Sequence, residues 1–242
     1  MLCIIIPFRR QPQFDRSAQL NTLLRHLRRH MAGPYKVVVV EQADDSRLFN
    51  RGALLNIGFC LRGKADTVLF HDVDLVPCTL LLRHYRSEDG VHHLGRCWTR
   101  YANNPRYLGG VLRMPVRTCL ALNGFPNTFW GWGGEDDDMN LRLEALAVPV
   151  SCPVSGKYED LEQCSLPRKL EVLRQHGLKC MNKWELLEAH HETWRNNGLN
   201  NLDFHVQCSE QLGLHAMKYT VDIHRGRKRS RSLSPDKSRA RW

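Results

Sequence analysis

Two kinds of hydrophobic pattern alternate along the first 75 residues of the chain. Residues 3–6, 35–42 and 66–74 contain short apolar runs, and the run YKVVVVEQ at 35–42 is β-branched almost throughout, as is typical of a strand covered on both faces. Residues 51–61 predict a helix. Between the first two runs, apolar side chains recur at spacings of three and four, which places them on one face of another helix: Leu20, Leu23, Leu24, Leu27 and Met31.

The order strand, helix, strand, helix, strand predicts an α/β fold with a mostly parallel sheet and helices on its faces. Ligands of such folds bind beyond the carboxyl ends of the strands. Three polar segments follow the predicted strands: residues 7–10, Glu41 with Gln42, and the sequence Asp72-Val73-Asp74. We expect a binding site where these segments meet.

The chemistry of two of these segments suits a diphosphate. Acids separated by one residue at the end of a buried strand are costly to leave unpaired, so a cation or a bound hydroxyl should meet Asp72 or Asp74. Arg9 and Arg10 after the first strand suit a phosphate. Together they predict a metal-bound diphosphate. The alternative is that the acids face bulk water, because so short a motif recurs by chance.

The segment FWGWGGEDDDMN, residues 129–140, places four consecutive carboxylates after a run of tryptophans and glycines. Like charges repel, but a helix N-terminus lessens that repulsion and leaves the carboxylates free to accept hydrogen bonds from a ligand. Glycines allow the loop that carries Trp132 to move over a substrate. The alternative is an acidic first helical turn beside tryptophans that belong to the core.

Composition adds a basic tail to this picture. The chain of 242 residues is 42% hydrophobic, enough for one sizeable core, and its formal net charge is +10. Residues 224–242 hold eight Lys and Arg against one acid, so residues 1–223 carry only about +3. We expect residues 222–242 to be disordered. They either contact nucleic acid, protein or an anionic surface, or form a solvated extension without a specific role.

The nine cysteines are odd in number and scattered, without the close spacing of a zinc site, and nothing in them requires a disulfide framework. The apolar run at the N-terminus stops at Pro7, too early for a signal sequence or a membrane span. We expect no transmembrane segment in this chain.

Four motifs in this order resemble the beta-1,4-galactosyltransferase family. They are FNRGALLNIGF (49–59), HDVDLVP (71–77), YLGGV (107–111) and NGFPNTFWGWGGEDDD (123–138). Weaker matches are IIPFR near the start, VVEQ, and GLNNLDFHV (198–206). The resemblance covers about residues 3–206, and the block WGWGGEDDD is its most specific part.

The resemblance implies a GT-A fold, one nucleotide-binding α/β domain. It implies inverting transfer of galactose from UDP-galactose to the 4-hydroxyl of an acceptor glycan or glycoside, with Mn²⁺, or Mg²⁺, on the diphosphate. Residues 1–221 would form the glycosyltransferase domain, with a donor-binding half at about 1–77 and an acceptor and catalytic half at about 95–206.

Site residues follow from the same resemblance, position by position. The residues that match the donor site are Pro7, Phe8, Arg9, Phe49, Arg51, Asp72, Val73, Tyr107, Gly110 and Trp132. Those that match the acceptor site are Trp132, Gly134, Glu135, Asp136 and Asp137. Asp136 matches the catalytic base, and Tyr107 matches the aromatic residue that favours galactose over its N-acetylated relative.

The metal site departs from the family pattern. Asp74 matches the first ligand, but the Met and His that complete the family site correspond here to Asp160 and Gln163. Hard oxygens suit Mg²⁺ or Mn²⁺, so we predict a divalent ion bound by Asp74, Asp160 and Gln163. The alternative is a solvated turn in which Glu159, Glu162 or His176 replaces the lost ligand, or none does.

Two other functions stay open on the sequence alone. One is an inactive relative that binds sugar or nucleotide and uses the basic tail to contact a partner. The other is a transferase for a different UDP-sugar. Family members usually lie in the Golgi lumen behind an N-terminal membrane helix. This chain has no such helix, so both the Golgi lumen and the cytoplasm remain open as locations.

Overall fold

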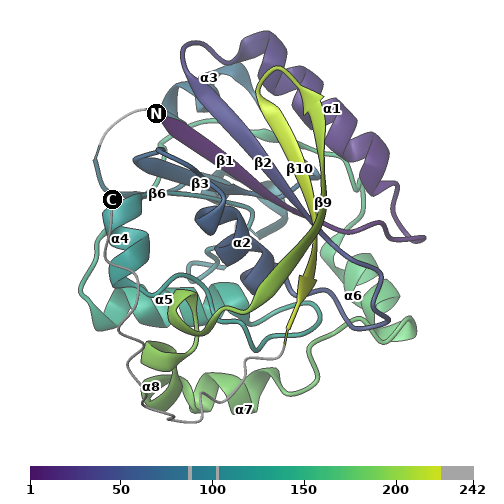
Figure 1. The fold of residues 1–242 in the computed structure, drawn as a ribbon, viewed down its shortest axis with the longest axis vertical. Coiled ribbons are helices and arrows are strands. Elements are labelled where there is room, and N and C mark those ends of the chain that lie inside the picture. Colours follow the sequence, from purple (N-terminus) through teal and green to yellow (C-terminus); the bar gives the residue numbers. More distant parts are fainter. Residues whose placement is uncertain (87–88, 102–103, 225–242) are drawn as a thin grey trace, which may run out of the picture.

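Eight strands form the central sheet of the computed structural model, which describes residues 1–86, 89–101 and 104–224. Their order across the sheet is β7-β5-β6-β3-β1-β2-β10-β9. In that order they span Val150–Ser151, Val91–His93, Val111–Pro115, Thr67–His71, Leu2–Phe8, Tyr35–Gln42, Ala216–Ile223 and Phe204–Gly213. Figure 1 labels the strands from β6 to β9 in this order. A separate two-stranded antiparallel sheet pairs β4 (Leu75–Pro77) with β8 (Tyr158–Asp160).

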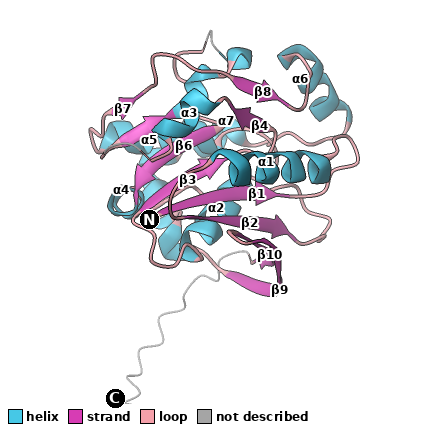
Figure 2. Cartoon of the chain, turned by 90° about the horizontal axis from the view of Figure 1, so that it is seen from above, coloured by secondary structure: helices cyan, strands magenta, loops and turns pink. Residues whose placement is uncertain are grey.

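The centre of the large sheet is parallel. Strands β3, β1, β2 and β10 run in the same direction, and Ile5 of β1 pairs with Val38 of β2 and with Phe70 of β3. All seven residues of β1 are buried, because alternate side chains point into two different cores. The predicted strands and the α/β fold are therefore confirmed, and Figure 2 shows the strands side by side from above.

Helix α1 (Arg16–His30) covers one face of this sheet. Its residues Leu20, Leu23 and Leu27 are buried against Ile4 and Ile6. Leu24 and Met31 pack partly buried against the same cluster, so the predicted helix and its apolar face are confirmed.

Helix α2 (Arg51–Cys60) covers the opposite face. It packs closely because Gly58 has no side chain: a Cβ atom there would lie 2.2 Å from Ile5 Cγ2. Asn50 fixes the N-terminus of α2. Its side-chain oxygen accepts a hydrogen bond from the Ala53 backbone amide, and its backbone amide donates to Gln42 Oε1. This contact holds Arg51 near the carboxyl end of β2.

Helix α5 (Glu135–Ala145) lies on the same face as α2, since Met139 and Leu143 join the same hydrophobic cluster. The other helices are α3 (Thr79–His84), α4 (Val116–Ala121), α6 (Leu166–Gln175), α7 (Lys183–Glu188) and α8 (His190–Thr193). Short 3₁₀ turns span Leu94–Cys97, Thr99–Tyr101, Trp194–Asn196 and Leu199–Asn201.

The third predicted strand is shorter than expected. β3 ends at His71, whereas the apolar pattern extends to residue 74. The Asp72 amide still donates to the Gly110 carbonyl at the end of the β3–β6 pairing, and residues 75–77 then pair with β8 in the second sheet. Asp72, Val73 and Asp74 therefore occupy the turn between two sheets.

The far edge of the sheet is a C-terminal hairpin. β10 pairs in parallel with β2 and antiparallel with β9, and it ends at Ile223, so the predicted domain boundary at residue 221 falls inside this strand. The predicted disordered tail lies outside the described residues from residue 225 onward. Among the described helices, none combines the length and the apolar character needed to span a membrane.

Candidate active site

A cavity of about 240 Å³ opens at the carboxyl ends of β1 and β3. Most of the sequence-predicted site residues line it: Pro7, Arg9, Phe49, Arg51, Asp72, Val73, Asp74, Tyr107, Trp132, Gly134, Glu135, Asp136 and Asp137. The structure thus gathers donor-site and acceptor-site predictions from five separate parts of the sequence around one cavity.

Two predicted donor contacts do not line the cavity. Phe8 is 3% exposed and packs in the α1-side core, because strand alternation places it on the same face as Ile4 and Ile6. Gly110 contributes through its backbone, since its carbonyl accepts the Asp72 amide. Its φ is +81°, and a Cβ atom there would lie 3.1 Å from Tyr107 Oη, so a glycine leaves room for the Tyr107 ring.

The four consecutive carboxylates form the first turn of α5, as predicted. The helix begins after Gly134, which has a φ of +111° and would carry a Cβ atom 2.3 Å from the Phe129 ring. Glu135, Asp136 and Asp137 line the cavity.

Asp138 has a different role, because it is buried behind the cavity. Its two oxygens accept from Arg142 Nε at 2.6 Å and contact His190 Nδ1 at 2.8 Å. Arg142 in turn donates to the backbone carbonyls of Gly124 and Asn197. This buried network joins α5 to α8 and holds the helix that carries the cavity-facing acids.

The loop before α5 lies against a segment from much later in the chain. The Trp132 amide donates to the Leu178 carbonyl at 2.8 Å, and the Cys180 amide donates back to the Trp132 carbonyl at 3.1 Å. The Trp132 side chain is 37% exposed, and Gly131 and Gly133 on either side have positive φ. The indole is therefore presented at the cavity mouth by a glycine-flanked loop.

Arg51 joins a carboxylate of the predicted donor-binding half to carboxylates of the predicted acceptor half. Its Nε donates to Asp72 Oδ1 at 2.8 Å, and its Nη1 donates to Asp136 Oδ1 at 2.8 Å and lies 3.4 Å from Glu135 Oε1. One guanidinium thus fixes the position of Asp136 relative to the end of β3. Lys183 of α7 forms a further ion pair with Asp137 at 2.6 Å.

Burial shifts the ionisation of these acids. It raises the pKa of Asp136, an effect that Arg51 opposes and Asp137 reinforces. Burial and the neighbouring Asp136 raise the pKa of Glu135 to about 7. The site therefore contains carboxyl groups that take up protons at higher pH than ordinary surface acids do.

Aromatic rings form the wall that carries Tyr107. Its ring stacks on Tyr101 with centroids 4.2 Å apart, and Trp98 packs edge-on against both. Trp98 and Tyr101 were not predicted from the sequence, although the segment CWTRY at 97–101 carries two large aromatics before the YLGGV motif. The cations Arg16, Lys169 and Lys183 also line the cavity but belong to no motif that could have predicted them.

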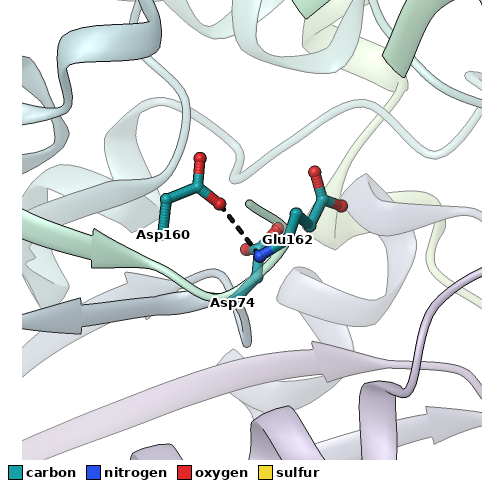
Figure 3. A group of neighbouring side chains, drawn as sticks. All are labelled: Asp74, Asp160 and Glu162. Carbon is teal, nitrogen blue, oxygen red and sulfur yellow. Dashed lines mark hydrogen bonds between the residues drawn. The ribbon is translucent and has the colours of Figure 1, made fainter. Parts of the chain in front are cut away.

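Three carboxylates meet beside the cavity: Asp74, Asp160 and Glu162, whose oxygens lie within 4.8 Å of one another (Figure 3). The pairing of β4 with β8 brings Asp160 next to Asp74, and the Glu162 amide donates to Asp160 Oδ1 at 3.0 Å. Gln163, predicted as the third metal ligand, is exposed in the turn that follows β8. In the turn after β8, it is Glu162 whose side chain is fully buried.

Similarity to known proteins identifies the family. The model for the N-terminal region of glycosyl transferase group 7 matches residues 1–81, and the model for the N-terminal domain of galactosyltransferase matches residues 90–163. Beta-1,4-galactosyltransferase 4 of Mus musculus is 34% identical over 234 residues, which cover 92% of this chain and 63% of that protein. The chain belongs to the beta-1,4-galactosyltransferase family.

A second relative of the same family also matches most of this chain, which covers a smaller share of that relative's length. Beta-1,4-galactosyltransferase 3 of Cricetulus griseus is 31% identical over 237 residues, which cover 91% of this chain and 55% of that protein. This galactosyltransferase-family chain thus spans less than two thirds of the length of these relatives.

Solved structures confirm the GT-A fold predicted from the resemblance. The catalytic domain of Drosophila beta-1,4-galactosyltransferase 7 in complex with xylobiose has a TM-score of 0.74 at 24% identity, over 92% of this chain and 94% of that chain. A mutant of the same protein, in complex with manganese, UDP-Gal and xylobiose, has a TM-score of 0.73 at 23% identity and the same coverage.

The three carboxylates Asp74, Asp160 and Glu162 of this galactosyltransferase-family chain offer the oxygen ligands that Mn²⁺ and Mg²⁺ prefer. Each of the three carboxylates, however, already pairs with a cation of the protein. Arg16 pairs with Asp74 at 3.1 Å, Arg100 pairs with Asp160 at 2.5 Å, and Lys169 pairs with Glu162 at 2.9 Å. In this arrangement the residues do not fit a divalent ion.

Proposed function

We propose that this chain transfers galactose from UDP-galactose to a hydroxyl of an acceptor sugar, with inversion at the anomeric carbon. The observation that carries the proposal is that Arg9, Tyr107, Trp132 and Asp136, drawn from separate segments of the chain, line one cavity. The Drosophila neighbour that shares this fold is described in complex with UDP-Gal and xylobiose, which supports both a nucleotide-sugar donor and a sugar acceptor.

The donor would bind beyond the carboxyl ends of β1 and β3. There Arg9 and Arg51 supply guanidinium groups suited to phosphate oxygens, and Phe49 and Pro7 supply apolar surface for the uridine. Tyr107 would limit the space beside the 2-position of the sugar, because its ring is fixed by stacking on Tyr101.

The acceptor would bind against the first turn of α5. Glu135 and Asp137 accept hydrogen bonds from sugar hydroxyls, and the Trp132 ring offers an apolar face. These contacts would hold the reacting oxygen, which we propose to be the 4-hydroxyl, in line with the departing diphosphate.

Asp136 would act as the general base. It removes the proton of the acceptor hydroxyl while the oxygen attacks the anomeric carbon and the bond to the diphosphate breaks, so that UDP leaves. Arg51 keeps the Asp136 carboxylate in position before the acceptor arrives. We assign no step to a divalent ion, because Arg16, Arg100 and Lys169 already bind the carboxylates that would hold one.

A transfer assay tests the proposal directly. The protein is incubated with UDP-galactose and a panel of xylosides, glucosides and N-acetylglucosaminides, and the product linkage is determined by NMR. We expect one acceptor class to yield a β-1,4-linked galactoside. UDP binding without turnover on any acceptor would instead favour an inactive relative that binds sugar or nucleotide. Turnover only with another UDP-sugar would favour a transferase for a different donor.

A further inference from the structure

The three carboxylates beside the cavity are matched by three basic side chains. Asp74, Asp160 and Glu162 meet Arg16, Arg100 and Lys169, so the six formal charges cancel. We infer that these basic residues take the place of a divalent ion, and that Arg16 and Lys169 provide the positive charge for the donor diphosphate. The inference rests on the proposed function, since it concerns how the same site binds UDP-galactose.

Glu162 is the centre of the cluster. One of its oxygens accepts from Arg16 Nη2 at 2.5 Å and the other from Arg100 Nη1 at 2.7 Å, while Lys169 Nζ lies within 3.0 Å of both. The side chain is fully buried. Its two oxygens are therefore fully used by the three cations.

The other two carboxylates are held in the same way. Asp160 Oδ2 accepts from Arg100 and from the Trp98 indole at 3.1 Å, and its Oδ1 accepts the Glu162 amide. Asp74 Oδ2 accepts from Arg16 Nη1 at 3.1 Å. A metal ion would have to compete with these contacts at both oxygens of Asp160 and Glu162 and with Arg16 at Asp74 Oδ2.

Displacing the cations would be costly. The side chains of Arg16 and Arg100 are only 12% and 4% exposed, so a divalent ion that took their partners would leave guanidinium groups buried without counter-charge. The arrangement is therefore self-consistent without a metal, whereas a metal requires the cluster to be rebuilt.

Two of the three cations can reach a ligand in the cavity. Arg16 and Lys169 line it together with Asp74, whereas Arg100 does not and serves only to neutralise the acids behind. An ammonium group has three donors, and Lys169 directs its contacts here to the single carboxylate of Glu162. A further N–H is thus available to donate to a phosphate oxygen. It would offset the negative charge of the diphosphate, as a divalent ion does.

Nucleotide binding by the full chain tests this inference without relying on turnover. UDP is titrated into the protein in a calorimeter, once in EDTA and once with excess Mn²⁺. We expect the same affinity in both conditions. Manganese alone, followed by electron paramagnetic resonance of the free ion, should show no uptake by the protein.

Variants of two residues on α6 test whether Lys169 is the group that binds UDP. Lys169→Met should weaken UDP binding about tenfold to a hundredfold, which corresponds to one charge-assisted hydrogen bond, and Lys169→Arg should restore most of it. The matched control is Arg174→Met, which removes an exposed cation from the same helix and should leave UDP binding unchanged. Thermal unfolding of each variant verifies that it folds, and should Lys169→Met fail to fold, the comparison of EDTA with Mn²⁺ still decides.

The outcomes separate this inference from the proposed function. UDP binding that appears only with Mn²⁺, or that is unaffected by Lys169→Met in a folded protein, would overturn the inference and leave the proposed function intact. An absence of binding to UDP and UDP-galactose in both conditions would overturn the proposed function, and the inference with it.

Discussion

Arg51 Nη1 donates a hydrogen bond of 2.8 Å to Asp136 Oδ1. The pair links the start of α2 to the first turn of α5, 85 residues later in the chain. Burial raises the pKa of Asp136, and Arg51 opposes that shift by favouring the ionised form of the proposed base. Activity should therefore fall as the pH is lowered through the raised pKa of Asp136.

Replacing Asp136 tests its role as the base. Asp136→Asn keeps the shape of the side chain but cannot accept the acceptor proton, so turnover should fall by about 10²–10⁴. UDP affinity, measured by calorimetry, should change little. The control is Asp89→Asn, which alters an exposed acid paired with Arg117. Near-normal turnover of Asp136→Asn would exclude this residue as the base.

Tyr107 is predicted to set the donor preference. Its ring is held against Tyr101 and lines the cavity, so it leaves little room for an acetamido group on the donor sugar. Tyr107→Leu should raise the rate with UDP-N-acetylgalactosamine relative to UDP-galactose, as measured by competition between the two donors. Tyr107→Phe, which keeps the ring, should retain the original preference. An unchanged ratio in the Leu variant would show that the pocket is assigned wrongly.

Asp138 should matter for stability and not for nucleotide binding. Asp138→Asn leaves the buried Arg142 without its counter-charge, and we expect a loss of about 3–5 kcal/mol in the free energy of unfolding in urea. The comparison is Glu171→Gln, which breaks an exposed pair with Arg174 on α6 and should cause no measurable change. Equal stability of the two variants would contradict the structural role assigned to Asp138.

Glu135 should make stability depend on pH. Its folded-state pKa is about 7, above the ordinary value of 4.5, so its contribution to stability is fully present below pH 4.5 and is lost as the pH rises through 7. Glu135→Gln removes this dependence. Between pH 5 and pH 8 the variant should gain about 1–3 kcal/mol relative to the wild type in urea unfolding. A constant difference across this range would show that the carboxyl has an ordinary pKa in the folded protein.

The sequence by itself determined the core and the location of the site. The β-branched run at Tyr35–Gln42 and the leucine spacing in Arg16–His30 are local patterns. The continuous run indicates a strand buried on both faces, and the spacing of three and four indicates which face of the helix is buried. The motif that contains Trp132 and Glu135–Asp138 could be assigned for the same reason, because it is continuous along the chain. The carboxyl ends of parallel strands then predicted where these residues would meet.

Only the tertiary structure decided which of the acids serve which purpose. Asp138 differs from Asp136 because His190, 52 residues later, packs behind α5, and no local pattern encodes that contact. Glu162 lies beside Asp74 and Asp160 because the turn after β8 buries its side chain, whereas the neighbouring Gln163 is exposed. Arg16 meets Glu162 across 146 residues of sequence. Such pairings depend on how distant elements pack, and single charged residues carry no periodicity that could predict them.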